Sequence, residues 1–139
     1  MSDAQRLRDL VDKSYERCRM TGTFPDDFYS IFLPSSPKVT GKFASTNMIE
    51  QKKMLDHGIR HLILFYHEPN SITSAKMVEL GESHARSGMN IEPELYDYFL
   101  EALLAAVKEN DPQCSDELLG AWREVASHGI SVMISMWDD

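Results

Sequence analysis

Residues 77–93 of the chain read MVELGESHARSGMNIEP. This segment predicts a helix that carries one histidine, then a corner broken by glycine, then a second helix that opens at Pro93. Met77, Leu80 and His84 are spaced by three and four residues, so they share one face of the first helix. The segment therefore places a single imidazole on an otherwise apolar helix face.

A histidine on an apolar helix face has two interpretations. Taken alone, it is more often a core side chain whose ring nitrogens are held by hydrogen bonds. A haem iron needs the same arrangement, because its ligand must project from an apolar wall into a slot between helices. The rest of the chain has to decide between these interpretations.

Composition indicates one ordinary folded domain over residues 1–139. The chain is 42 % hydrophobic, which is enough for a sizeable core. Its net charge of −8 argues against nucleic acid or an anionic membrane as the main partner, because both select for a surplus of Lys and Arg. The sequence shows no secretory signal and no membrane-length apolar run. Cys18 and Cys114 lack metal-type spacing and indicate reduced thiols in a cytoplasmic protein.

The hydrophobic pattern predicts an all-α fold of six or more helices, because no segment alternates as a half-buried strand does. Their unequal lengths and the proline-rich corner favour a globule of crossed helices over an up-and-down bundle. The first three expected helices cover residues 3–18, a segment that begins at Pro25 and is ended by Pro34 and Pro37, and residues 46–66, which Thr46 or Asn47 caps. The fourth is capped by Ser71 or Ser74 and stopped by Gly88. The last two cover residues 93–108 and a segment from Ser115 that includes Trp137.

An ordered set of signals extends over nearly the whole chain. Each signal is weak by itself, but the order and the separations are specific. The set is Phe28-Tyr29, Pro37, Phe43, Gln51 with Leu55, Leu80 with His84, Ile91, Pro93, Tyr96 and Trp122. With this set the chain resembles a globin, and the nearest group is the bacterial single-domain globins related to the haem domain of flavohaemoglobins. The resemblance implies the globin fold and one haem b (iron protoporphyrin IX).

The resemblance also implies roles for individual residues. His84 matches the proximal histidine that ligates the haem iron, and Phe43 matches the phenylalanine that stacks against the haem. Tyr29 and Gln51 match the distal pair above the iron, and Leu55 matches the apolar residue that limits the space for a ligand. Further contacts with the cofactor are expected from Leu80, Ser83, Met89, Ile91 and Tyr96.

The chemistry of Tyr29 and Gln51 suits this distal role. Dioxygen on ferrous haem carries partial superoxide charge, which a phenol hydroxyl and an amide can stabilise as hydrogen-bond donors. Without the resemblance, Tyr29 would be a core aromatic whose hydroxyl is tied to the backbone. Gln51 would then be a solvated residue on a helix surface.

The chain departs from the flavohaemoglobin pattern on the proximal side. In that pattern a tyrosine and a glutamate near the chain end bond toward the proximal imidazole. Tyr96 matches the tyrosine, but Trp137 occupies the place of the glutamate. A neutral indole cannot accept the imidazole N–H as a carboxylate does, so we expect a backbone carbonyl or Ser83 to be the partner. The segment from Phe43 to Gln51 is also shorter than in that group.

The pair His57 and His61 offers a different kind of site. The two imidazoles are one helical turn apart and could bind a metal on the helix surface. They lie off the face of Gln51 and Leu55, so the pattern favours a solvated surface instead.

Two functions compete at this point. The first is reversible binding of dioxygen, nitric oxide or carbon monoxide for storage, delivery or nitric oxide detoxification; the last role yields nitrate and needs a separate reductase. The second is a gas sensor that acts through a partner or through an output domain, and whether the gene continues past Asp139 would discriminate. Loss of haem binding is disfavoured because Phe43 and His84 are both present. A monomer or a homodimer is expected.

Overall fold

The computed structural model describes residues 2–67 and 70–138. In these residues the chain forms α-helices, one 3₁₀ turn and no strand, which confirms the all-α prediction. None of the described helices is both long and apolar enough to cross a membrane. The elements are α1 (Asp3–Met20), α2 (Phe24–Phe32), the 3₁₀ turn η1 (Leu33–Ser35), α3 (Pro37–Lys42), α4 (Met48–His67), α5 (Ser71–His84), α6 (Leu95–Asn110) and α7 (Asp116–Ser135).

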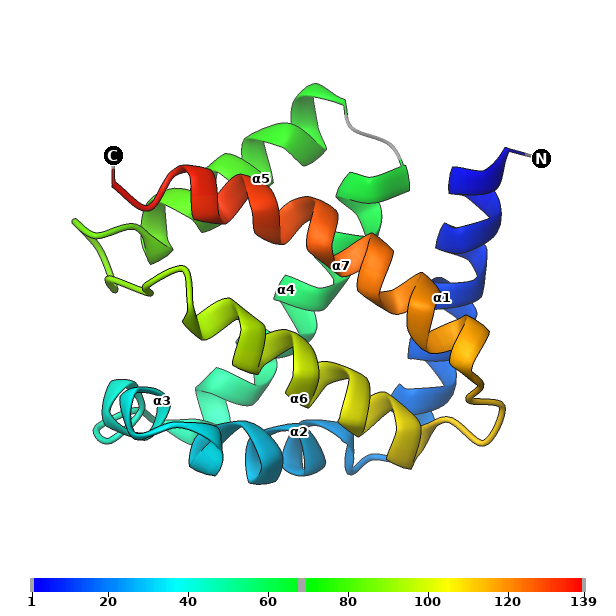
Figure 1. Ribbon diagram of the computed structural model, residues 1–139, viewed down its shortest axis with the longest axis horizontal. Helices are drawn as coiled ribbons and strands as arrows, with labels where there is room; N and C mark the ends of the chain where they lie inside the picture. Colours follow the sequence, from blue (N-terminus) through cyan, green and yellow to red (C-terminus); the bar gives the residue numbers. More distant parts are fainter. Residues whose placement is uncertain (1, 68–69, 139) are drawn as a thin grey trace.

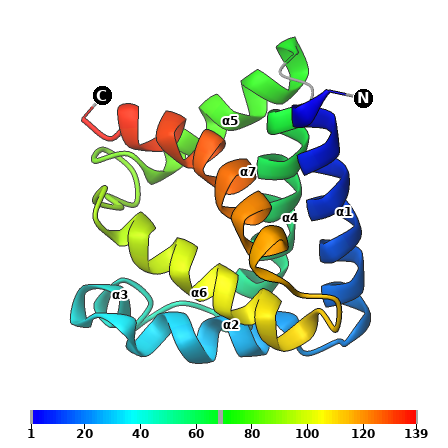
Figure 2. The same ribbon diagram turned by 45° about the vertical axis from the view of Figure 1, so that its right-hand side comes forward.

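The helices cross one another instead of running in parallel. Figures 1 and 2 show α2 beside α6 at one end of the molecule, α5 beside α7 at the other, and α1 and α4 between the two ends. Helix α7 packs against α1, α4, α5 and α6, so it is the central element of the fold. The core between the helices is made of large apolar side chains that are almost fully buried, among them Val11, Phe28, Ile59, Leu103 and Trp122.

Capping groups fix where several helices begin. At α1, Ser2 Oγ accepts the Gln5 N–H at 3.2 Å, and Gln5 Oε1 accepts the Ser2 N–H at 3.2 Å, which is a reciprocal capping box. At α7, Ser115 Oγ accepts the Leu118 N–H at 3.1 Å, as the sequence predicted. Both caps follow from local chemistry alone.

The start of α5 differs from the prediction. Neither Ser71 nor Ser74 caps the helix. The Asn70 side chain does so by accepting the N–H groups of Ile72 at 2.9 Å and Thr73 at 3.0 Å. An amide oxygen one residue earlier satisfies two free donors at once, which is why the helix begins at Ser71.

The proline-rich corner is more helical than expected. The sequence predicted that Pro34 and Pro37 would end α2 and leave an irregular segment. The chain instead continues through η1 into the short helix α3, which Pro37 opens. Proline is well suited to a first helical position, and Ser36 Oγ caps α3 by accepting the Lys38 N–H at 3.2 Å.

The corner after α5 is tighter than predicted. Helix α5 ends at His84, four residues before Gly88. The Met89 N–H turns back to the Ser83 carbonyl at 2.9 Å, and a Cβ at Gly88 would lie only 2.5 Å from that oxygen. Glycine is therefore needed here because the backbone folds onto itself.

Two glycines let α5 approach its neighbours closely. A Cβ at Gly129 would lie 2.5 Å from Leu62 Cδ2 and 3.1 Å from Met77 Cε. A Cβ at Gly81 would overlap Met136 Sδ. Gly81 is three residues before His84, so the thioether of Met136 packs against the same helix that carries the imidazole.

A buried polar network joins α1 to the end of α6. Asp111 is 2 % exposed. It accepts hydrogen bonds from Ser14 Oγ at 2.6 Å, Arg17 Nε at 2.6 Å and Arg17 Nη2 at 2.9 Å. Ser14 in turn accepts the indole N–H of Trp122 at 2.9 Å. These contacts tie three helices together around one carboxylate.

We expect Asp111→Ala to lower the free energy of unfolding by about 3 kcal/mol, because it removes one partner of a buried ion pair. Burial tends to raise the pKa of Asp111, but bonds from Arg17 and Ser14 outweigh it, so the pKa lies below 3.8. The contribution is therefore present above the ordinary carboxyl pKa and is lost as the pH falls through the native one. Urea unfolding near neutral pH and in acid measures both effects.

The control for this prediction is Glu101→Ala, which breaks the exposed pair with Arg123 and should change stability by less than about 1 kcal/mol. A difference between wild type and Asp111→Ala that stayed constant into acid would contradict the assigned role of the carboxylate.

Candidate haem-binding site

His84 stands at the last position of α5 with its ring half-buried. Its Nδ1 lies 2.7 Å from the Leu80 carbonyl oxygen and 2.9 Å from Ser83 Oγ. A carbonyl can only accept, so Nδ1 carries the proton and Nε2 carries a lone pair. Burial lowers the pKa of His84 below 6.5, although the Leu80 carbonyl acts in the opposite direction. The ring is therefore neutral near pH 7, which is the form that binds metals.

The Nε2 atom of His84 has no hydrogen-bond partner in the described part of the chain. Among those residues the one buried, unpartnered side-chain nitrogen or oxygen is Arg8 Nε. The lone pair on His84 Nε2 therefore faces accessible space and is not sealed among protein atoms. A core histidine without a metal would use both ring nitrogens in hydrogen bonds to the protein. A histidine that binds a metal bonds to the protein through one nitrogen and keeps the other for the metal.

The groups around His84 Nδ1 are electrically neutral. The expected carbonyl partner and Ser83 are both in place, and no carboxylate bonds to the ring within the described residues. Trp137 lies just beyond α7 and not inside it, and its indole N–H donates to Asn90 Oδ1 at 3.1 Å. Tyr96 is buried, which raises its pKa to about 12.

Tyr29 of α2 and Gln51 of α4 meet each other through their side chains. Gln51 Nε2 donates to the Tyr29 hydroxyl oxygen at 3.1 Å, and the Tyr29 hydroxyl lies 3.4 Å from the Gln51 carbonyl oxygen. Tyr29 is 4 % exposed, and burial raises its pKa to about 12. The phenol keeps its proton and holds it in a weak bond, so it can donate to a ligand. Gln51 is half-buried and is not the solvated surface residue of the competing interpretation.

The aromatic and aliphatic residues expected to contact the cofactor differ in how deeply they are buried. Phe43 follows α3, with its ring centroid 6.1 Å from that of Tyr29 and 5.7 Å from that of Phe32. Leu55 is buried in the core, while Phe43, Leu80 and Ile91 are only partly covered at its edge. Apolar side chains that the protein covers only in part offer surface that a flat apolar cofactor would bury.

Two expected contacts lie further out. Met89 is 49 % exposed in the corner between α5 and α6. Ser83 is exposed as well, and its hydroxyl bonds to the Leu80 carbonyl at 2.9 Å. The sequence pattern did not indicate Lys42 and Glu92, whose side chains meet at 3.2 Å between α3 and the corner after α5. No local signal marks them, because both resemble ordinary solvated charges.

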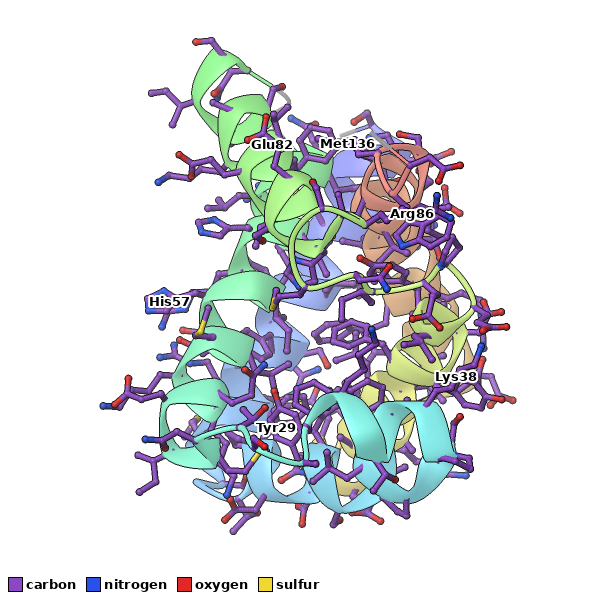
Figure 3. The ribbon with its side chains drawn as sticks, turned by 90° about the vertical axis from the view of Figure 1, so that its left-hand side faces the viewer. Tyr29, Lys38, His57, Glu82, Arg86 and Met136 are labelled. Carbon is purple, nitrogen blue, oxygen red and sulfur yellow. The ribbon has the colours of Figure 1, made fainter. Side chains whose placement is uncertain are left out.

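The competing sites gain no support. His57 points away from the molecule in Figure 3, and His61 is half-buried on the same helix. No group of three His, Cys, Asp or Glu side chains suited to a metal is found among the described residues. A surface groove between α1 and α4 is lined by charged side chains such as Lys13 and Arg60, and it includes none of the candidate site residues.

Comparisons with known proteins agree with this geometry. The globin family model matches residues 26–133. A crystal structure from Pseudomonas aeruginosa PAO1, described as that of a protein structurally highly homologous to a human hemoglobin, superposes with a TM-score of 0.90 at 43 % sequence identity. The match covers 96 % of this chain and 99 % of that one. The chain therefore belongs to the globin family and is a haem-binding globin.

Proposed function

We propose that this globin binds dioxygen reversibly at the iron of a haem b held by His84, and that carbon monoxide and nitric oxide bind at the same place. The haem supplies the iron atom to which a diatomic gas attaches. The observation that carries the proposal is the buried Tyr29–Gln51 pair, in which Gln51 donates to the phenol oxygen at 3.1 Å. That contact leaves the phenol proton for a ligand with partial negative charge.

Visible absorption spectra test the core of this proposal. Purified protein loaded with haem should give distinct ferric, ferrous and carbon monoxide spectra, with a shift on exposure of the ferrous form to dioxygen that reverses when the gas is removed. Rapid irreversible oxidation to the ferric form instead of a reversible shift would contradict dioxygen storage or delivery.

Nitric oxide dioxygenation is the proposed enzymatic role, with a separate reductase as electron source. Without a reductase, nitric oxide consumption in the presence of dioxygen should then stop after one molecule of nitric oxide per haem. It should resume when a reductase and its electron donor are added. We also propose a cytoplasmic location, which the two unpaired cysteines Cys18 and Cys114 support.

A gas sensor is the second candidate, and one set of contacts favours it. The Arg86 N–H donates to the Trp137 carbonyl at 2.7 Å, and the Trp137 indole bonds to Asn90. The end of the chain is thus tied to the corner that follows His84, and movement of this corner would reach anything attached there. Ligand-dependent hydrogen exchange at Arg86 supports a sensor, and unchanged exchange argues for a carrier.

The neutral surroundings of His84 Nδ1 predict a weak peroxidase. A carbonyl and a hydroxyl leave the imidazole less anionic than a carboxylate would. The iron–histidine stretching frequency of the ferrous, ligand-free protein should therefore lie in the low range of neutral imidazoles. Trp137→Glu should raise it if the carboxylate reaches the ring. A wild-type frequency as high as in peroxidases would mean that a carboxylate such as Glu79 or Glu94 has taken this role.

A further inference from the structure

Two lysines of α3 face the corner between α5 and α6. Lys42 Nζ donates to the Asn90 carbonyl at 2.6 Å and lies 3.2 Å from Glu92 Oε1. Lys38 Nζ lies 3.4 Å from Glu92 Oε2 and also pairs with Glu94. In Figure 3, Lys38 and Arg86 of the corner lie on the same side of the molecule. We call the contacts of Lys42 with Asn90 and Glu92 the corner bridge.

The corner bridge is better shielded than the lysine pairs around it. The side chains of Lys42 and Glu92 are 26 % and 24 % exposed, whereas those of Lys38 and Glu94 are 59 % and 58 % exposed. The Lys42 ammonium lowers the pKa of Glu92, so the carboxylate stays charged. Salt screens a partly buried ion pair less than an exposed one, so the partly buried pair contributes more to the stability of the contact between the two segments.

The bridge connects two chain segments that carry candidate site residues. Lys42 directly precedes Phe43, whose ring lies beside Tyr29 on the distal side. Glu92 directly follows Ile91, whose N–H donates to the carbonyl of His84 at 2.9 Å. The corner bridge, together with the more exposed pairs of Lys38, therefore holds the segment that follows His84 to the segment that carries Phe43.

Asn90 is held in the shape that the bridge requires. Its φ of 54° lies in the left-handed region, which residues other than glycine seldom adopt. Its N–H donates to the Ala85 carbonyl at 2.9 Å, and its side-chain oxygen accepts the Trp137 indole at 3.1 Å. These two contacts fix the peptide so that its carbonyl meets Lys42. Backbone strain of this kind persists where surrounding contacts over-determine it.

We propose that the corner bridge closes the edge of the haem site and controls the rate at which haem leaves. The inference rests on the proposed binding of haem by His84. Phe43 and Ile91, the neighbours of the bridge residues, are both expected to contact the cofactor. The edge between them opens when Lys42 separates from Glu92 and Asn90. Because the bridge is electrostatic, added salt weakens it and speeds haem loss.

The test is transfer of haem from the full-length ferric protein to an excess of apomyoglobin, at low and at high salt. Lys42→Met and Glu92→Gln should each speed transfer about tenfold, which corresponds to 1.4 kcal/mol. High salt should speed transfer from wild type, and by a smaller factor from the two variants, which keep the exposed pair of Lys38 with Glu94. The reversed pair, Lys42→Glu with Glu92→Lys, should recover only part of the wild-type rate, because the contact with Asn90 is not restored and the pair of Lys38 with Glu92 is lost.

Lys52→Met is the matched control. Lys52 pairs with Asp26 at 2.6 Å and joins α4 to α2 away from the corner. Its substitution should leave the transfer rate and its salt dependence unchanged. Fast transfer from Lys42→Met with an unchanged rate from Glu92→Gln would overturn the proposal, because the lysine would then act on the cofactor's own carboxylates. Equal rates in all variants would also overturn it.

Hydrogen exchange separates this proposal from the assignment of His84. The Ile91 amide of the full chain should exchange faster in Glu92→Gln than in wild type. Unchanged exchange at Ile91 would overturn the corner bridge even if haem binds as proposed. A third outcome is faster exchange at Ile91 together with a His84→Ala variant that keeps its haem. The bridge would then exist, but it would not close a site in which His84 holds the haem, and both proposals would be overturned.

Discussion

His84→Ala is expected to lose the proximal bond to iron and most of its haem. The wild-type ring is oriented by the Leu80 carbonyl and by Ser83, so that Nε2 is free to bind the metal. Alanine would remove that proposed ligand and leave only the expected apolar contacts of Phe43 and Ile91, which would not fix the iron. The haem-to-protein ratio after gel filtration and the ferrous spectrum measure the loss.

Two comparisons make the His84 result specific. His57→Ala changes an exposed histidine of α4 and should keep full haem content. Added free imidazole should restore part of the haem to His84→Ala, because it can occupy the space that the side chain has left. A variant with wild-type haem content and an unchanged ferrous spectrum would show that His84 is not the ligand.

Tyr29→Phe should speed dioxygen dissociation roughly ten- to a hundredfold, because one lost hydrogen bond to a charge-like acceptor costs about 1.5–3 kcal/mol. Carbon monoxide release should change much less, since that ligand carries less charge. Stopped-flow displacement measures both rates, and the exposed Tyr98 supplies the control variant Tyr98→Phe. Equal changes for the two gases would indicate altered packing in place of a lost donor.

Gln51 should act largely through Tyr29. Its amide donates to the phenol oxygen, so it orients and polarises the hydroxyl. Gln51→Leu should therefore have a smaller effect than Tyr29→Phe, and almost none in a Tyr29→Phe background. A double-mutant cycle measures this coupling. An undiminished effect of Gln51→Leu in that background would mean that the amide reaches the ligand directly.

Sequence reasoning predicted features that depend on local chemistry or on helical periodicity. The cap at Ser115 follows from a hydroxyl that precedes a helical pattern, and the shared face of Met77 and His84 follows from spacing. It failed where distant segments decide the conformation. Helix α5 ends at His84, and just beyond it the Arg86 N–H donates to the Trp137 carbonyl at 2.7 Å, a contact with a distant segment that spacing alone does not show.

The candidate site shows the same division. The resemblance implied that Tyr29 and Gln51 act together, and the structure brings them within hydrogen-bond distance. It could not reveal that Lys42 meets Glu92, because each is an ordinary charged residue and they lie fifty positions apart in the sequence. Nor could it show that the Trp137 indole bonds to Asn90 and not to the imidazole.

The contact of Gly81 with Met136 has an evolutionary consequence. The thioether lies where any larger residue at position 81 would place its first carbon. A larger residue at position 81 would therefore require Met136 to move, while the distal candidates Tyr29 and Gln51 stay untouched. Under the proposed function, changes at this contact would act on the proximal side and on ligand affinity, while the preference between gases would depend on Tyr29. We then expect two properties to vary independently among related chains. Ligand affinity should vary with residues 81 and 136, and the preference between gases should vary with residues 29 and 51.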